Sequence, residues 1–239
     1  MIAIIDSGIA NLRSVEKALL RLSVEAQVID DPAQLREASG IILPGVGAFA
    51  DGIAKLRSQG FVESLRREIE RGKPVLGICL GLHFLFSESE EFGLHKGMDL
   101  IPGRVVRFRD DPADPTAAGD RLKIPHMGWN RVRIERPAPI LQGLPDEPFF
   151  YFVHSYYVEP ADPAVTAGTT EYGQRFTSVI WRDNLFATQF HPEKSQAIGL
   201  HLLKNFAALA RSARRGDPGL GGAGIDGRQA SEGGPGGPG

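Results

Sequence analysis

Short, mostly apolar runs alternate with amphipathic helical segments through the N-terminal part of the chain. The apolar runs are residues 2–5, 26–29, 40–43 and 74–78, and the helical segments are residues 11–22, 49–60 and 61–71. Strands without polar alternation are covered on both faces, which is typical of parallel strands joined by crossover helices. The pattern predicts an α/β fold built on a doubly wound, mostly parallel sheet with helices on both faces. In such a fold the ligand crevice lies at the carboxyl ends of the strands.

After Gly103 the apolar residues recur with period two, at residues 105–108, 129–134, 149–153, 176–181 and 185–190. This alternation predicts antiparallel strands that extend or cap the parallel sheet. Ser195 is the expected N-cap of a last helix. A chain of 239 residues fits one domain, which we predict to span residues 1–211. Residues 212–239 are rich in Gly and Pro, and we expect them to form a disordered tail unrelated to the chemistry.

Charge and composition exclude several classes of protein. The chain carries 27 Lys and Arg against 29 Asp and Glu, a net charge of -2, whereas a nucleic-acid binder needs an excess of cations. It contains no run of about 18 uncharged apolar residues, and it begins Met-Ile-Ala-Ile-Ile-Asp, without the pattern of a signal peptide. We therefore expect a soluble, cytoplasmic protein that binds neither nucleic acid nor membranes. The single cysteine, Cys79, excludes an intramolecular disulfide and a thiolate metal cage.

Cys79 lies in the pentapeptide Gly-Ile-Cys-Leu-Gly, residues 77–81, which ends a predicted strand and opens a helix predicted from Leu80 to about Phe86. Small residues on both sides of a nucleophile permit a sharp strand-to-helix turn that exposes its side chain in the crevice. A sulfur at the start of a helix also faces the positive end of the helix dipole, which favours the thiolate. The ordinary alternative for a lone cysteine is burial as a small apolar side chain.

A thiol nucleophile needs a base and a group that orients the base. The sequence Phe-His-Pro-Glu at residues 190–193 follows a predicted strand and offers His191 as the base and Glu193 as its brace. Taken alone, a His-x-Glu sequence is more often a surface loop. It indicates a catalytic site here because the chain also contains the predicted elbow cysteine. The remaining histidines lack the paired spacing of a metal site, and we predict no metal. They are His83, His95, His126, His154 and His201.

Acyl transfer also requires donors for a developing oxyanion. The sequence Pro-Gly-Val-Gly at residues 44–47 ends a predicted strand that we expect beside the cysteine strand. Its glycines let the backbone N–H groups around Val46 turn toward a ligand. An ordinary turn between strand and helix is the alternative.

These motifs together resemble the triad (class I) glutamine amidotransferases. More narrowly, they resemble the family of glutaminase subunits of imidazole glycerol phosphate synthase, an enzyme of histidine biosynthesis. The narrower resemblance rests on Asp-Ser-Gly at residues 6–8, Asn-Leu-Arg-Ser at 11–14, Pro-Gly-Val-Gly-Ala-Phe at 44–49, His-Met-Gly-Trp-Asn at 126–130 and Tyr-Phe-Val-His-Ser-Tyr at 151–156. It covers the chain from residue 1 to about residue 210 and leaves the tail outside.

The resemblance implies a mechanism that needs no cofactor. Cys79 attacks the side-chain amide of glutamine, His191 takes the thiol proton and returns one to the leaving ammonia, and Glu193 holds the imidazole ring. Water then hydrolyses the glutamyl thioester. In this family the ammonia passes to a separate cyclase partner, which is a (β/α)₈ barrel and completes a heterodimer. There it contributes to imidazole glycerol phosphate and the purine precursor AICAR.

The resemblance also implies roles for residues outside the triad. The implied oxyanion and glutamine-binding residues are Gly45, Val46, Gly47, Leu80, His83, Glu91, Ser155 and Tyr156. Those implied at the partner contact and ammonia exit are Asn11, His126, Trp129, Tyr151 and Lys194. Ordinary alternatives are core packing for Trp129, helix capping for Asn11, a solvated charge for Lys194 and an acidic surface for Glu91.

One position departs from the family. Where members commonly have Met-Gln after the elbow glycine, this chain has Leu82 and His83. The glutamine normally helps to hold the substrate, and a neutral imidazole can also donate one hydrogen bond and accept another.

Two other functions remain as alternatives. One is a free-standing cysteine hydrolase or a glutaminase of another pathway, such as pyridoxal phosphate synthesis. The motifs at residues 44–47 and 126–130 count against it. The other is a non-catalytic docking subunit, against which the complete set of Cys79, His191 and Glu193 counts.

Overall fold

The structure, a computed structural model, describes residues 1–8, 11–109 and 122–215. Its strands are β1 (Ile2–Ile5), β2 (Ala26–Ile29), β3 (Gly40–Gly45), β4 (Val75–Cys79), β5 (Phe86–Ser89), β6 (His95–Lys96), β7 (Ile101–Arg107), β8 (His126–Arg131), β9 (Arg133–Ile134), β10 (Phe149–His154), β11 (Tyr156–Pro160), β12 (Thr166–Tyr172), β13 (Gln174–Arg182) and β14 (Leu185–Thr188). Its α-helices are α1 (Leu12–Arg21), α2 (Phe49–Ser58), α3 (Phe61–Glu70), α4 (Leu80–Phe84) and α5 (Gln196–Arg215). Short 3-10 helices lie at Pro32–Arg36, Pro139–Leu141, Pro163–Val165 and Pro192–Lys194.

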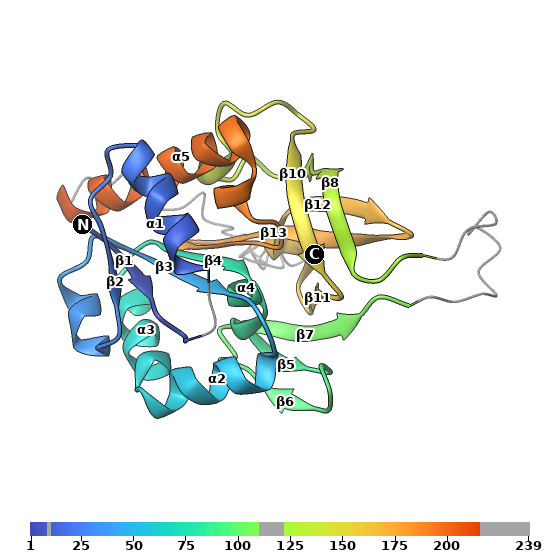
Figure 1. The fold of residues 1–239 in the computed structure, drawn as a ribbon, viewed down its shortest axis with the longest axis horizontal. Coiled ribbons are helices and arrows are strands. Elements are labelled where there is room, and N and C mark those ends of the chain that lie inside the picture. The colour runs from blue at the N-terminus through green and yellow to red at the C-terminus, as the bar shows by residue number, and fades with distance from the viewer. Residues whose placement is uncertain (9–10, 110–121, 216–239) are drawn as a thin grey trace, which may run out of the picture.

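The parallel half of the main sheet has the strand order β2-β1-β3-β4-β14, and every neighbouring pair in it runs parallel. Successive side chains of a strand face opposite sides of the sheet: Ile4 packs with α1 and α5, whereas Ile5 packs with α2 and α3. In α1, Val15 and Leu19 are one helical turn apart and form its buried face. Figure 1 shows the two helix pairs on opposite sides of the sheet. The prediction of a doubly wound parallel sheet is confirmed.

Beyond β14 the sheet continues as antiparallel strands, in the order β14-β13-β11-β7, and ends with β5 and β6. The predicted antiparallel extension is therefore confirmed, but sequence patterning missed β5, β6, β11 and β12. The segment Phe86–Ser89 has only one apolar residue, and Thr166–Tyr172 is dominated by Thr and Gly. Backbone pairing with a neighbouring strand, rather than an apolar pattern, makes such segments strands.

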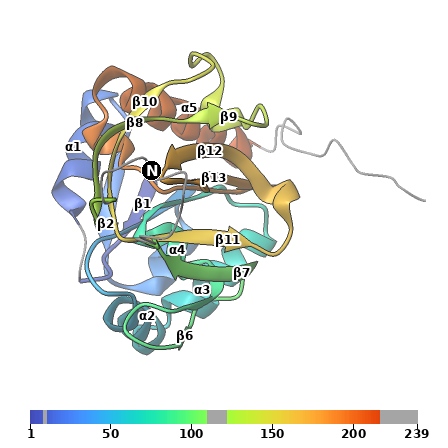
Figure 2. The same ribbon diagram turned by 90° about the vertical axis from the view of Figure 1, so that its right-hand side faces the viewer.

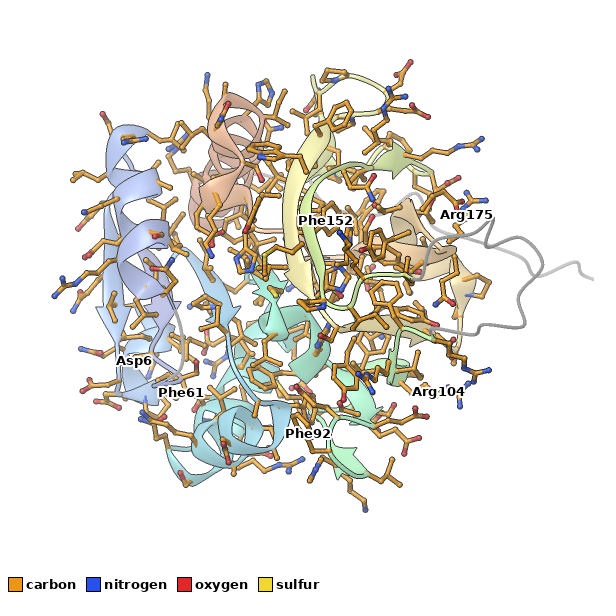
Figure 3. All side chains as sticks on the ribbon, turned by 45° about the vertical axis from the view of Figure 1, so that its right-hand side comes forward. Asp6, Phe61, Phe92, Arg104, Phe152 and Arg175 are labelled. Carbon is orange, nitrogen blue, oxygen red and sulfur yellow. The ribbon has the colours of Figure 1, made fainter. Side chains whose placement is uncertain are left out.

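Strands β8 and β10 form a separate two-stranded antiparallel ribbon that lies against the main sheet (Figure 2). Its inner side carries Phe150 and Phe152, which belong to the core. Phe152 is labelled in Figure 3. The single strand predicted at residues 129–134 is wrong. The chain instead divides it at the buried Val132, so that β8 pairs with β10 and β9 pairs with β12.

Three predicted boundaries near the catalytic motifs also change. The strand predicted to reach Phe190 ends at Thr188. The helix predicted to reach Phe86 ends at Phe84, because Phe86 is the first residue of β5. The last helix begins at Gln196, directly after Ser195 as predicted, but the Ser195 hydroxyl donates to the His191 carbonyl at 2.7 Å. It therefore ties the catalytic turn together instead of capping the helix.

The predicted domain boundary at residue 211 falls inside α5, which continues to Arg215. The remainder of the predicted tail, residues 216–239, lies outside the described residues. Within the ranges that the structure describes, none of the helices combines the length and apolar character that a bilayer crossing requires.

Candidate active site

Cys79 stands at a strained turn between β4 and α4. Its backbone has φ 54° and ψ -109°, a conformation that a non-glycine residue adopts only when its surroundings enforce it. The enforcing contact is the close approach of α4 to β3, since a Cβ on Gly81 would lie 1.8 Å from the Leu43 carbonyl oxygen. The predicted elbow is therefore present, and packing against the neighbouring strand fixes the direction of the sulfur.

Replacing Gly81 with alanine is expected to destabilise the protein by about 3 kcal/mol, because the new methyl group collides with rigid backbone. Thermal or urea unfolding measures the loss. Gly72→Ala is the matched control: its φ is +81°, but no atom lies within 4 Å of its would-be Cβ. Backbone strain alone makes its expected cost about 1 kcal/mol. Equal losses in the two variants would contradict the role of the close packing.

His191 and Glu193 meet as predicted, in the turn that follows β14. His191 Nδ1 and Glu193 Oε1 are 2.7 Å apart, and both side chains are 2% exposed. The turn is held from β10, because the His191 N–H donates to the Tyr151 carbonyl at 2.9 Å and the Tyr151 N–H donates to Ser195 Oγ at 3.0 Å. The ring is thus fixed on one side by a carboxylate and through its backbone by the ribbon.

Cys79 and His191 lie on the wall of the same cavity. His191 Nε2 is buried, with no hydrogen-bond partner of regular geometry among the described residues. Burial opposes the charged ring, but the Cys79 sulfur and the Glu193 carboxylate outweigh it and raise the pKa of His191 to about 10. A ring whose pKa is raised in this way is suited to take the proton of a cysteine thiol, which generates the nucleophile.

A cavity of about 460 Å³ opens over Cys79 and His191. The other residues on its wall are Val46, Gly47, Leu80, His83, Glu91, Phe92, Pro125, Val153, His154, Ser155 and Tyr156. The structure thus gathers in one place all the predicted oxyanion and substrate residues except Gly45, which lies beside Cys79 in the register of β3 and β4. The volume is within the range of small-molecule sites.

Glu91 lies on the cavity wall and also reaches the start of α2. Its Oε2 accepts a hydrogen bond from the Phe49 N–H at 2.9 Å. Burial raises the pKa of Glu91, and the bond from Phe49 only partly opposes this. The partial burial of Glu91 and its bond to Phe49 count against a purely solvated acidic surface. The next residue, Phe92, is exposed at the cavity edge (Figure 3).

His83 bonds to a residue that the sequence analysis missed. Its Nε2 is 2.9 Å from Oε1 of Gln189, and both side chains are buried. Burial lowers the pKa of His83 to about 4, despite the opposing effect of the Gln189 bond, so the imidazole is neutral at pH 7. The available signal was an amide directly before Phe-His-Pro-Glu, at the end of a buried strand.

His126, predicted near the partner contact, lies in the interior with 3% of its surface exposed. Its Nδ1 is 3.0 Å from His154 Nε2, and His154 Nδ1 is 2.8 Å from the Tyr156 carbonyl oxygen. Because a carbonyl only accepts, His154 donates to it, and His126 in turn donates to His154. His126 therefore supports the cavity wall from behind. Among the described residues, no group of three or more His, Cys, Asp or Glu side chains is arranged to hold a metal ion.

The outer side of the β8–β10 ribbon is an exposed apolar surface, which we call the ribbon face: Met127, Trp129, Phe149 and Tyr151. Trp129 is 47% exposed, so the core-packing alternative is wrong for it. Its ring centre lies 6.2 Å from that of Tyr151, and Lys194 Nζ lies 5.9 Å from the centre of the same tyrosine ring.

Asn11 lies at the start of α1, which packs against the turn that carries Lys194. Its side chain makes no capping hydrogen bond to the helix backbone. The Asn11 Oδ1 instead accepts from Ser14 Oγ at 3.0 Å. Asn11 is therefore the N-cap residue of α1 by position, although its side chain bonds to the Ser14 hydroxyl and not to the helix backbone.

Comparison with known proteins agrees with this geometry. The sequence model of the family described as glutamine amidotransferase class-I matches residues 3–209. Imidazole glycerol phosphate synthase subunit HisH of Syntrophotalea carbinolica is 57% identical over 209 residues, which cover 87% of this chain and 100% of the relative. HisH of Moorella thermoacetica is 54% identical over 212 residues, covering 89% and 96%.

Solved structures show the same fold at low identity. PurLQS from Thermotoga maritima has a TM-score of 0.64 at 17% identity and covers 88% of this chain and 97% of its own. A glutamine amidotransferase from the same organism has a TM-score of 0.58 at 15% identity, covering 92% of each chain.

The fold and the cysteine elbow are thus those of a class I glutamine amidotransferase, and the chain belongs to that family. Within the family it belongs to the HisH group, the glutaminase subunits of imidazole glycerol phosphate synthase in histidine biosynthesis. HisH is named as one subunit of the synthase, so it belongs to a complex with another.

Proposed function

We propose that Cys79, His191 and Glu193 hydrolyse glutamine in the cavity above them, and that the ammonia passes to a cyclase subunit of (β/α)₈ fold. The chain and the cyclase form a heterodimer in the cytoplasm. The observation that carries the proposal is the buried pair of His191 and Glu193, whose Nδ1 and Oε1 atoms are 2.7 Å apart, with His191 on the cavity wall that also carries the elbow cysteine.

The proposed reaction follows from the placement of these three side chains. The Cys79 thiolate attacks the amide carbon of glutamine, and an oxyanion forms on the amide oxygen. His191 gives its proton to the amide nitrogen, the carbon–nitrogen bond breaks, and ammonia leaves a glutamyl thioester on the sulfur. His191 then takes a proton from water, the resulting hydroxide attacks the thioester, and glutamate leaves as the thiolate is restored.

The remaining cavity residues fit the substrate by their chemistry. Backbone N–H groups of the Val46–Gly47 turn and of Leu80 are the donors proposed for the oxyanion, and the φ of 95° at Gly47 suits a turn that aims its backbone at a ligand. The Glu91 carboxylate pairs with the α-ammonium group of glutamine. Ser155 and Tyr156 form the opposite wall.

The ribbon face is the proposed docking surface for the cyclase. It exposes aromatic side chains, which dominate binding energy at protein interfaces. It also connects directly to the catalytic base, since the backbone of Tyr151 bonds to His191 and to the hydroxyl of Ser195. A partner that moves β10 therefore moves His191, which gives a physical route by which docking raises glutaminase activity.

An assay of glutamate formation tests the proposal. The purified chain is measured alone, with the cyclase, and with the cyclase and its nucleotide ligand. A strong rise on adding both is the expected result. Weak activity that the partner leaves unchanged would favour a free-standing hydrolase or a glutaminase of another pathway, and no turnover under any condition would favour a docking subunit.

Replacing Trp129 with alanine is expected to weaken binding of the cyclase about 30-fold, the effect of losing an aromatic hot spot of about 2 kcal/mol. Titration calorimetry measures the dissociation constant. Leu20→Ala is the matched control, because Leu20 is 72% exposed on α1 and lies outside the ribbon face. Equal effects of the two substitutions would contradict the proposed docking surface.

A further inference from the structure

Three side chains from separate elements form a buried series behind the nucleophile. His83 comes from α4, Gln189 follows β14, and Cys79 ends β4. His83 Nε2 lies 2.9 Å from Gln189 Oε1, and Gln189 Nε2 lies 4.0 Å from the Cys79 sulfur. Gln189 is 0% exposed and is not among the residues of the cavity wall, so it reaches the sulfur from within the protein interior.

Hydrogen-bond chemistry fixes the direction of this series. The Gln189 amide oxygen has no proton, so the neutral His83 must carry its proton on Nε2 and donate it. The amide nitrogen then faces the sulfur and donates to it. The opposite orientation would place the amide oxygen against a thiolate, which brings two acceptors into contact.

We infer that Gln189 is a positioning residue that stabilises the Cys79 thiolate from behind, and that His83 holds its amide in the donating orientation. The inference deepens the proposed function and rests on it for its catalytic consequence. Gln189 keeps its protons throughout, so no proton passes along the series. Its donor is present when the sulfur is a thiolate before attack and again when the thioester collapses.

This assigns His83 a role other than the one the family's glutamine has at this position. The ring lies on the cavity wall, but its Nε2 is turned to Gln189. A hydrogen bond between this ring and the substrate glutamine would therefore have to use Nδ1, which is an acceptor in this tautomer. The departure at residue 83 thus supports the nucleophile rather than supplying a donor to the substrate.

The titratable groups around the sulfur come from every element packed on it. His191 and Glu193 lie in the turn after β14, His154 in β10, His83 in α4, and Glu91 across the cavity. Gln189 is an uncharged donor among them. Replacing it therefore leaves the charges of the site unchanged, and any change in thiolate formation reports on the donor itself.

The test is the rate of Cys79 alkylation by iodoacetamide, measured on the full chain from about pH 5 to about pH 9. Gln189→Met keeps the length of the side chain and removes the donor. Its alkylation midpoint is expected to move up by about one pH unit, the effect of about 1.4 kcal/mol, with a tenfold slower reaction near pH 6 and an unchanged plateau. His83→Leu removes the hydrogen bond that holds the Gln189 amide, and it is expected to move the alkylation midpoint in the same direction. His83→Gln retains a donor to Gln189, and its midpoint is expected to lie close to that of the wild type.

Ser178→Ala is the matched control. Ser178 Oγ accepts a buried hydrogen bond from Thr170, and the Ser178 backbone carbonyl accepts one from the Gln189 N–H. Loss of the Ser178 hydroxyl is expected to lower the stability of the protein without moving the alkylation midpoint of Cys79. A wild-type profile in Gln189→Met overturns the inference, and if that variant does not fold, a wild-type profile in His83→Leu overturns it. Alkylation needs neither glutamine nor the cyclase, so failure here is distinct from failure of the proposed function.

Discussion

Glutamate production is expected to fall by at least about 10⁴-fold when Cys79 is replaced with alanine, because the thioester route then has no nucleophile. The assay is made in the presence of the cyclase and its nucleotide ligand, where activity is highest. The fold is expected to persist, since the elbow is set by the packing of Gly81 on Leu43 and not by the sulfur.

Thermal unfolding of the Cys79→Ala variant provides the control for folding, and its binding to the cyclase provides the control for docking. Both are expected to match the wild type. A variant that binds the cyclase and still forms glutamate at more than about one per cent of the wild-type rate would contradict a cysteine nucleophile.

Replacing His191 with asparagine is expected to reduce glutamate formation by about 10⁴-fold, because no group then protonates the leaving ammonia or activates water. The same change removes the imidazole ring that Glu193 braces. Steady-state kinetics with the cyclase present separates an effect on the chemical step from an effect on glutamine binding. The value of kcat is expected to fall, while KM for glutamine changes little.

Glu193→Gln is the matched variant for this experiment. It keeps a polar group of the same shape beside Nδ1 and removes only the charge. Its expected loss is smaller than that of His191→Asn, because the imidazole remains. A Glu193→Gln loss as large as that of His191→Asn would mean that the carboxylate does more than orient and charge the ring.

The local parts of the site could be predicted from sequence because each is encoded by adjacent residues. Glycines on both sides of Cys79 predict the elbow, and His191 and Glu193 are two residues apart in one turn. The parallel order of β3 and β4 then brings Gly45 level with Cys79. These elements needed only short-range patterns together with the rule that ligands bind at the carboxyl ends of parallel strands.

The parts that depend on tertiary contacts could not be predicted in the same way. The role inferred for Gln189 depends on its contact with His83, which is distant in sequence and is brought to it by α4. The burial of His126 was not predicted, because its motif also contains the exposed Trp129. The period of two along β8 turns residues 126, 128 and 130 away from the face that carries Met127 and Trp129. That alternation was visible in the sequence, but the division of the strand at Val132 was not.

The most direct test of the account is to search for the covalent intermediate. The wild-type chain, bound to the cyclase and its nucleotide ligand, is mixed with glutamine, quenched rapidly in acid and digested for peptide mass spectrometry. The peptide that contains Cys79 is expected to carry one added γ-glutamyl group, which is lost when the quenched sample is treated with hydroxylamine. Continued glutamate formation with no acylated Cys79 peptide at any quench time, or with the glutamyl group on another residue, would contradict the account.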